Sequence, residues 1–567
     1  MNQPSPAIVA QSSVRRLPRR ALLLLCAAYV LAGFIGRDPL KNADVTAFGT
    51  MLELVAGTSS WWNPTLMGQS DPGVLLPHWL GAWAIALAPA WVDPAFAVRI
   101  PFMALLATAL AATWYGVYYL ARAPRAQPVA FAFGGEARPT DYARALADGG
   151  LLALVACLGL AQLSHETTPA LAQLGCAALA FFGLAALPYR TAQALAALAA
   201  GLLGLALSGA PTVAVLLGLG GAATCLIERG EDDSPTDRRR QALWVLALAL
   251  ATAAIALALD LWRWRIALPP AQWSTWRSLG RLLLWFTWPV WPLALWTLWR
   301  WRGQLLGGRP ERHFAIPLWF LFVLVGGTLV APPSDRALLL GLPALAALAA
   351  FALPTFGRSA GALIDWFTLL FFSSCAITIW VIWISLQTGV PAKPAANVAK
   401  LAPGFEPVFS LPAFVLALAA TGVWIWLVRW RVGRHPAAIW KSLVLPAGGT
   451  ALCWFLLMTL GMPTLNYARS YAPLVRLVQA QMKTQTQVPQ GCVEIHGFTR
   501  AQIAAFRFHG GMDLRTASAA ASDCPWLLVH SDALPTMRDT VGSQPWTLVA
   551  SVRRPADKDE DMLLFRR

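Results

Sequence analysis

The stretch ALLLLCAAYVLAGFIGRDPLKNADVTAFGTMLEL, residues 21–54, decides the fold class of this chain. It begins with an apolar run, 21–36, continues through a charged loop and then becomes apolar again. Apolar runs of about 17–25 residues, enough to cross a hydrocarbon layer of about 30 Å, recur from there to about Met462. The pattern predicts a polytopic α-helical membrane protein.

The composition agrees with this interpretation. The chain is 57% hydrophobic and 13% charged, whereas soluble proteins carry about 25% charged residues. Its net charge of +16 could indicate nucleic acid as a partner. Most Arg and Lys, however, lie in short loops between apolar runs, where they set topology. We therefore expect membrane lipid, and no nucleic acid, as a partner.

The first apolar run resembles a signal peptide because four arginines precede it, at 15, 16, 19 and 20. No small-residue cleavage site follows it, and many more spans do. We therefore expect a first helix that is retained in the protein.

Basic loops mark the cytoplasmic side of the membrane. They contain Arg15–Arg20; Arg122, Arg125, Arg138 and Arg144; Arg229 and Arg238–Arg240; Arg300, Arg302, Arg309 and Arg312; and Arg429, Arg431, Arg434 and Lys441. The apolar runs between them predict about 13 transmembrane helices in a bacterial inner membrane. Everything from Pro463 to Arg567 is then periplasmic.

Between Arg20 and Arg122 there are three apolar stretches, and both flanks are cytoplasmic only if one stretch fails to cross. The stretch 74–92 is interrupted by Pro77, His78 and Pro89. We expect it to lie along the membrane surface.

Three regions follow from this topology. Residues 1–20 form a cytoplasmic tail, 21–465 form the transmembrane domain with a first periplasmic loop at 37–73, and 466–567 form a periplasmic C-terminal domain. From about Val488 the segments CVEIHG, PWLLVH, PWTLVASV and DMLLF are typical of short strands, with TRAQIAAFRFHG as a helix. The tail is therefore predicted to be a small α/β domain.

The cysteines divide between the predicted membrane and the predicted tail. Of the eight Cys, six fall in apolar spans, where a small buried hydrophobe is the usual role. Cys492 and Cys524 lie in the tail, where a disulfide would close a loop of about 30 residues and stabilise it by about 3–4 kcal/mol. Two unpaired buried thiols are the alternative.

Carboxylates are rare in this sequence, so Asp38 and Asp44, just beyond the first span, are candidates for chemistry. A carboxylate at a membrane face can take the proton of an acceptor hydroxyl. Arg37 and Lys41 beside them are suited to hold an anionic group such as phosphate. The alternative is a solvated loop in which Asp38-Pro39 forms a turn.

Segment 42–122 resembles the opening of the C-type membrane glycosyltransferases (GT-C), most of all the lipid A aminoarabinose transferases and the protein O-mannosyltransferases. The resemblance rests on the shared order of several motif residues. They are Asp44, Phe48, Trp61, Pro64, Gly68, Pro77, Trp79, Arg99 and Pro101. His165 and Glu166 stand where the family has a second acidic loop, and the resemblance extends over about residues 20–360. The chain departs from the pattern at Val45, where the family has a second carboxylate, and at Ser208, where it often has Lys.

The resemblance implies transfer of a sugar from a polyprenyl-phosphate carrier to an acceptor hydroxyl of lipid A, another envelope glycan or a protein. It implies Asp44 as the group that deprotonates the acceptor. Cations near the same face would stabilise the developing phosphate charge: Lys41, Arg263, Arg265, Arg336 and Arg469. The alternatives are an interfacial Trp/Arg belt for Arg263 and Arg265, a snorkelling side chain for Arg336 and a loop cation for Arg469.

His165 and Glu166 are secondary candidates, together with Asp38. A divalent metal ion held by His165, Glu166 and Asp44 is one hypothesis; a cap for the helix that begins near Thr167 is the other. Two rival functions also stay open, a transporter or flippase of lipid-linked saccharide and a non-catalytic relative. The absence of internal repeats and the clustering of polar residues at one face favour the enzyme.

Overall fold

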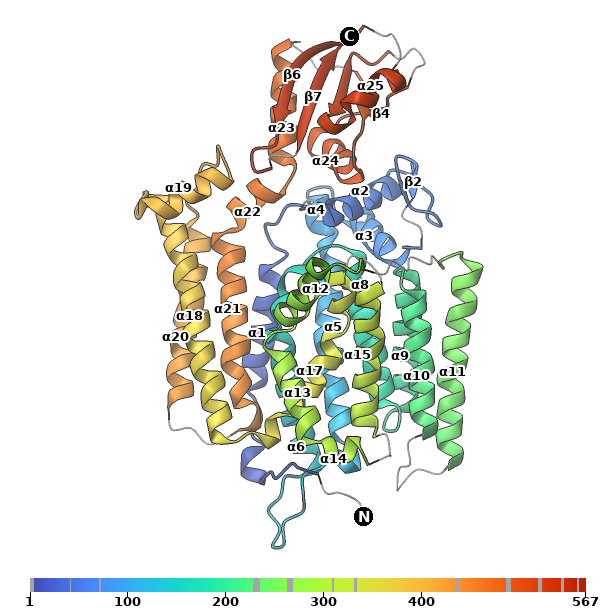
Figure 1. Cartoon of the computed structure of the whole chain (residues 1–567), viewed down its shortest axis with the longest axis vertical. Coiled ribbons are helices and arrows are strands. Elements are labelled where there is room, and N and C mark those ends of the chain that lie inside the picture. Colours follow the sequence, from blue (N-terminus) through green and yellow to red (C-terminus); the bar gives the residue numbers. More distant parts are fainter. Residues whose placement is uncertain are drawn as a thin grey trace.

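The computed structural model describes residues 5–567 except 41, 71–72, 228–234, 263–268, 308–310, 331–333, 434–437, 486–490, 519–522, 542–544 and 558–559. The described residues form a bundle of helices with a small domain on one end (Figure 1). The N-terminus lies at the opposite end of the molecule from the C-terminus. We call these the N-terminal end and the domain end of the bundle.

A long series of helices precedes the small domain. In chain order they are α1 (Arg19–Ala32), α2 (Ala43–Val55), α3 (Leu76–Leu87), α4 (Pro94–Ala97), α5 (Arg99–Ala121), α6 (Pro139–Ala156), α7 (Leu158–Leu163), α8 (Pro169–Ala186), α9 (Thr191–Leu207), α10 (Pro211–Ile227), α11 (Pro235–Ala258), α12 (Trp273–Phe286), α13 (Val290–Arg300), α14 (Arg302–Leu305), α15 (Arg312–Val330), α16 (Ser334–Leu339), α17 (Leu342–Ala350), α18 (Arg358–Thr388), α19 (Ala392–Leu401), α20 (Leu411–Val432), α21 (Val444–Leu460), α22 (Met462–Arg469) and α23 (Ala472–Gln485).

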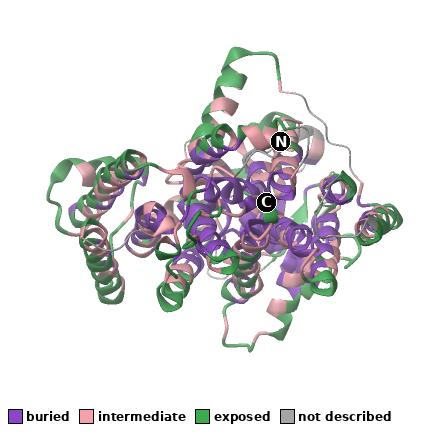
Figure 2. Ribbon diagram, turned by 90° about the horizontal axis from the view of Figure 1, so that it is seen from below, coloured by how far each residue is buried: buried purple, intermediate pink, exposed green. Residues whose placement is uncertain are grey.

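Within the described ranges, seven helices are long and apolar enough to cross a membrane: α5 with α4, α8, α11, α15, α18, α20 and α21. The bent pair α12 and α13, with 86° between the two helices, would make an eighth, and α9, α10 and α17 are shorter apolar helices. Buried residues gather in the middle of the bundle, whereas its outer helices carry many exposed residues (Figure 2). The chain is a multi-pass membrane protein of helices, as its apolar runs predict.

The basic segments share one end of the bundle. The start of α1, the connection from α5 to α6, helix α14 and the facing ends of α10 and α11 and of α20 and α21 all lie at the N-terminal end (Figure 1). Helices α2, α3, α4, α12 and α19 lie at the domain end. The predicted alternation of basic and non-basic loops is therefore reproduced by the path of the chain.

Helix α3 covers most of the stretch whose crossing was in question. It has 12 residues and so a length of about 18 Å, shorter than a hydrocarbon layer of about 30 Å. It lies beside α2 at the domain end, where α4 also lies (Figure 1). Pro77 at its start and Pro89 after its end agree with a short helix that stays at one end of the bundle.

The small domain is built around a five-stranded sheet. Its elements are β3 (Val493–His496), α24 (Arg500–Gly510), β4 (Leu514–Thr516), β5 (Trp526–His530), α25 (Leu534–Val541), β6 (Thr547–Arg553) and β7 (Asp561–Arg566). The strand order is β4-β3-β5-β7-β6, with β4, β3 and β5 parallel and β7 antiparallel to both of its neighbours. Helix α24 is preceded by a capping box of Thr499 and Gln502 and followed by Gly511, whose φ of 59° suits glycine.

Cys492 and Cys524 form a disulfide just before β3 and β5, with Cα atoms 4.9 Å apart. The loop that it closes spans 32 residues and contains β3, α24 and β4. The bond therefore ties together the starts of two neighbouring parallel strands.

Replacing both Cys492 and Cys524 by Ala is expected to lower the stability of the small domain by about 3 kcal/mol, because the unfolded loop is no longer constrained. Hydrogen exchange of β3 and β5 in the full-length protein measures this loss. The matched control is Cys26→Ala, in α1, which should leave the exchange of both strands unchanged. Equal protection in the double variant and the wild type would contradict the prediction.

Candidate functional site

Asp44 lies in the first turn of α2 and is buried. Its Oδ1 accepts hydrogen bonds from the Thr167 backbone N–H at 2.8 Å and the Thr167 hydroxyl at 2.7 Å. Its Oδ2 accepts one from the Leu40 N–H at 3.0 Å. A carboxylate in a first helical turn is also stabilised by the helix dipole. Asp44 is therefore held in one orientation by two segments that are distant in sequence.

Arg37 is a buried cation beside this carboxylate, with 4% of its surface exposed. Its Nη2 lies 3.9 Å from Asp44 Oδ2 and 4.0 Å from Glu166 Oε1. Both distances suit ion pairs but exceed a hydrogen bond. Within the described residues, the Nε and Nη2 of Arg37 have no hydrogen-bond partner. The guanidinium therefore keeps N–H donors that an anionic group can use.

Glu166 joins a second arginine to this group. Arg336 of α16 donates from Nη2 to Glu166 Oε2 at 3.2 Å. Two carboxylates and two guanidinium groups thus alternate in the order Asp44, Arg37, Glu166, Arg336. We call these four residues the charged cluster. It joins the segment after α1, the start of α2, the loop between α7 and α8, and α16.

The segment that carries Arg37 is fixed from both sides. Asn466 of α22 donates from its amide to Gly36 O at 2.9 Å and accepts from the Asp38 N–H at 3.1 Å. Arg99, at the start of α5, donates to Phe34 O at 3.1 Å. Asn466 was not a candidate in the sequence. It is a positioning residue for the charged cluster.

A cleft of about 600 Å³ opens beside this segment, at the domain end. It is lined by Asp38, Gly404, Phe405, Glu406, Val408, Pro463, Asn466, Tyr467, Pro473, Arg476, Leu477 and Pro555. The lining mixes carboxylate, guanidinium, amide and phenol groups with the rings of Phe405 and Tyr467, 5.5 Å apart. Asp38, which lies in one wall of the cleft, directly follows Arg37 in the sequence.

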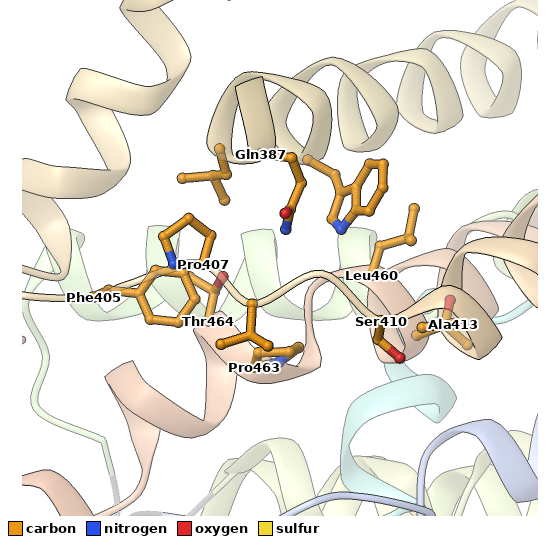
Figure 3. A pocket seen from close by; sticks show the side chains of 12 residues that line it. Gln387, Phe405, Pro407, Ser410, Ala413, Leu460, Pro463 and Thr464 are labelled. Carbon is orange, nitrogen blue, oxygen red and sulfur yellow. The ribbon is translucent and has the colours of Figure 1, made fainter. Parts of the chain in front are cut away.

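A smaller cavity of about 20 Å³ shares Phe405, Val408 and Pro463 with the cleft (Figure 3). The side chain of Gln387, from α18, points into it toward the segment that carries Pro407. Trp383 and Leu460, also in its lining, belong to the ends of α18 and α21. The cleft and the cavity together connect the ends of these helices with the neighbourhood of Arg37.

No protein-family model and no curated protein sequence matches this chain. Among solved structures it is similar to ArnT from Cupriavidus metallidurans bound to undecaprenyl phosphate, with a TM-score of 0.60 and 14% identity over 97% of this chain and 98% of that one. The chain has the fold of a C-type glycosyltransferase. The same ArnT in the apo state matches with a TM-score of 0.60 and 14% identity over 96% of this chain and 97% of that one. The arabinosyltransferase EmbB from Mycobacterium smegmatis matches at 0.41 with 15% identity, over 81% of this chain and 43% of that one.

The resemblance to the lipid A aminoarabinose transferases is thus confirmed at the level of the fold. The C-type fold brings Asp44, Glu166 and Arg336 together as members of one charged cluster. Asp38 lies beside it, in the wall of the cleft. Arg469 is exposed at the end of α22 and forms no ion pair with a described residue. Lys41, Arg263 and Arg265 lie outside the described residues.

His165 faces away from the charged cluster. Its Nε2 lies 2.9 Å from Tyr29 O, and its Nδ1 faces the carbonyl of Ala161. The ring packs against Trp454 with centroids 4.7 Å apart. Among the described residues no group of three His, Cys, Asp or Glu is placed to hold a metal ion. The structure therefore assigns His165 to packing between α1, the loop after α7, and α21.

The small domain rests on the helix that carries Asp44. Arg507 of α24 forms an ion pair with Glu53 of α2, and Phe508 meets Phe48 edge to face with ring centroids 4.7 Å apart. A Cβ added at Gly49 would lie 2.4 Å from the Cβ of Ala504. Only glycine therefore allows α2 and α24 to approach so closely.

His509 follows these contacts in α24. Burial lowers the pKa of His509, although the charge of Asp38 acts in the opposite direction. Because an imidazole has an ordinary pKa of about 6.5, a lowered value keeps His509 neutral at pH 7. The small domain thus adds no positive charge at this position at neutral pH.

Gly49→Val is expected to separate α24 from α2 and to destabilise their contact by about 1–3 kcal/mol, because the added side chain cannot fit against Ala504. The measurement is hydrogen exchange of α24 and α2 in the purified protein. Gly422→Val in α20 is the control, because a Cβ there meets nothing within 4 Å. Unchanged protection of α24 in Gly49→Val would show that the contact does not hold the domain.

Proposed function

We propose that this protein is a glycosyltransferase of the periplasmic face of a bacterial inner membrane. It moves a sugar from a polyprenyl-phosphate carrier to an acceptor hydroxyl. The observation that carries the proposal is the charged cluster: a buried, oriented carboxylate, Asp44, beside a buried guanidinium, Arg37, with unused donors. The fold supports it, because the solved ArnT with this fold is bound to undecaprenyl phosphate.

The proposed topology has 13 crossings. The crossing helices are α1, α5, α6, α8, α9, α10, α11, α13, α15, α17, α18, α20 and α21. The basic loops at the N-terminal end then lie in the cytoplasm. The domain end lies in the periplasm, an oxidising compartment that suits the disulfide of Cys492 and Cys524. The proposed domains are a tail at 1–20, a membrane domain at 21–465 and a periplasmic domain at 466–567.

In the proposed reaction Asp44 acts as general base. The acceptor oxygen attacks C1 of the sugar while its proton passes to Asp44. The bond between C1 and the carrier phosphate breaks, and the electron pair of that bond goes to the phosphate oxygen. The hydrogen bonds from Thr167 and Leu40 keep the carboxylate in place without filling its acceptor capacity.

The same step increases negative charge on the departing phosphate, and Arg37 offers donors for it. Glu166 is bonded to Arg336 and lies at ion-pair distance from Arg37, so it keeps both guanidinium groups in place. The low exposure of Arg37 strengthens its interaction with an anion, because little water competes. Oriented donors of this kind lower a barrier without reorganisation at the moment of reaction.

We further propose that the acceptor reaches Asp44 through the cleft next to Asp38. Its volume of about 600 Å³ lies in the range of sites for small ligands. The rings of Phe405 and Tyr467 are suited to pack on the apolar face of a sugar, and Asn466 and Arg476 to bond its hydroxyls. The ends of α18 and α21 lead from the cleft toward the membrane, which suits an acceptor with a lipid anchor.

Asp44→Asn is expected to lower sugar transfer at least 10²-fold while the protein keeps its melting temperature, because an amide cannot accept the acceptor proton. Arg37→Gln should lower transfer about 10²–10³-fold, as does loss of one oriented donor. The assay follows a labelled sugar from its polyprenyl-phosphate carrier into envelope glycans, and mass spectrometry of the same glycans names the acceptor. Lys400→Gln, an exposed cation of α19 at the same end, is the control.

Unchanged sugar transfer by the Asp44→Asn variant would contradict the proposed mechanism, in which Asp44 is the general base. Movement of labelled lipid-linked saccharide across the membrane by that variant would instead favour a flippase.

Tyr467→Leu and Arg476→Ala are expected to raise the KM for the acceptor about tenfold, because each removes a wall of the cleft. Hydrolysis of the donor by water, measured without acceptor, should stay at the wild-type rate. Lys483→Ala is the matched control for Arg476→Ala, since both are exposed cations of α23 but only Arg476 lines the cleft. An unchanged acceptor KM in both cleft variants would place the acceptor elsewhere.

A further inference from the structure

A long groove runs between α1 and α5, apart from the charged cluster. Its volume is about 1070 Å³. One wall is a face of α1 that includes Leu22, Cys26 and Val30. The opposite wall is a face of α5 with three exposed alanines, Ala104, Ala107 and Ala111. Small residues on a membrane helix usually allow another helix to approach closely, but these three line open space.

The length of the groove matches one half of a membrane. Its lining on α1 runs from Arg19 to Leu31, which at 1.5 Å per residue is about 18 Å. One leaflet contributes about half of a hydrocarbon layer of about 30 Å. An acyl chain of one leaflet that runs along α1 therefore lies within the groove over about the whole length of the chain.

The end of the groove near the N-terminus is basic. Arg16, Arg19 and Arg144 are exposed there and belong to its lining. Arg16 forms an ion pair with Asp141, with Nη2 3.6 Å from Oδ1. Neither Arg19 nor Arg144 forms an ion pair with another described residue. The apolar part of the groove suits acyl chains, and its basic end suits a negative headgroup. The groove therefore complements an anionic lipid.

One carboxylate also lines this end, Asp148 of α6. It is 4% exposed, and its oxygens accept hydrogen bonds from Trp114 Nε1 at 2.9 Å and from the Leu17 N–H at 3.3 Å. These bonds fix Trp114 and Leu17, which lies two residues before α1, in the lining of the groove. Asp148 is thus buried and bonded within the protein, with the charge of Arg144 also acting on it, whereas Arg16, Arg19 and Arg144 are exposed.

We propose that this groove binds an anionic phospholipid from the leaflet at the N-terminal end of the bundle. Its acyl chains lie along α1 and α5, and its phosphate lies among Arg16, Arg19 and Arg144. The occupant fills the space that α1 leaves beside the alanine face of α5. Because α1 leads directly into the segment of Arg37, the lipid supports the helix that positions the charged cluster.

The test is native mass spectrometry of the full-length protein in detergent, with phosphatidylglycerol and phosphatidylcholine of identical acyl chains added in equal amounts. We expect the wild-type protein to retain one phosphatidylglycerol molecule, and the complex with phosphatidylglycerol to be at least fivefold more abundant than the complex with phosphatidylcholine. Arg19→Gln and Arg144→Gln should each weaken phosphatidylglycerol binding about fivefold, the size expected for one surface cation. Arg300→Gln, an exposed arginine at the same end outside the groove, should have no effect.

The apolar part is tested by filling it. The double variant Ala107→Leu and Ala111→Leu should lose bound phosphatidylglycerol at least fivefold, whereas Ala419→Leu, on the exposed side of α20, should retain it. Equal binding of the two lipids, or retention in the filled variant, would overturn the proposal. Displacement of the lipid by undecaprenyl phosphate would also overturn it and would assign the groove to the sugar carrier.

These outcomes are independent of the catalytic proposal. Asp44→Asn should lower transfer at least 10²-fold and leave phosphatidylglycerol binding unchanged, so a failure of either proposal is recognised separately.

Discussion

The structure depends on one buried guanidinium, Arg37, held at ion-pair distance from two carboxylates. Transfer of an isolated charge into an apolar interior costs several kcal/mol even after relaxation, so the fold has to supply compensation at this point. Asp44 and Glu166 supply it from two separate segments. Because both distances are longer than hydrogen bonds, the compensation is Coulombic and leaves donors of Arg37 available. The same constraint that makes the region costly to fold therefore makes it suited to bind an anion.

The small domain helps to meet this constraint from outside the bundle. Helix α24 packs on α2, which begins with Asp44, and Glu53 and Gly49 of α2 are contacts for it. The linker that leads to the domain takes part as well, since Asn466 of α22 bonds the backbone on both sides of Arg37. Farther along, Arg554 of the small domain donates to Ala468 O and Ser470 O in this linker. The domain and the loop after α1 thus form one continuous set of contacts.

Much of this arrangement could be predicted from sequence, because apolar length and loop charge are local properties. The apolar runs and the short, proline-bounded α3 are examples. Asp44 and Glu166 were also identifiable, since carboxylates are rare in an apolar chain. Arg37 was identifiable as a cation suited to hold an anion, but its buried, central position was not, because nothing in RDPLKNAD tells that this side chain turns inward. Asn466 was missed because its partners, Gly36 and Asp38, are more than 400 residues away in the sequence.

The missing second carboxylate of the family pattern is explained by the same geometry. Val45 directly follows Asp44, at the position where the family pattern has the second carboxylate. In the structure Val45 is fully buried in the apolar cluster shared by α2, α23 and the sheet of the small domain. A carboxylate at this position would be desolvated among apolar side chains. Glu166 provides a second carboxylate from the loop after α7, on the side where Arg37 and Arg336 lie. Position 45 is thus used to seat the small domain on α2, while Asp44 and Glu166 are the two carboxylates of the charged cluster.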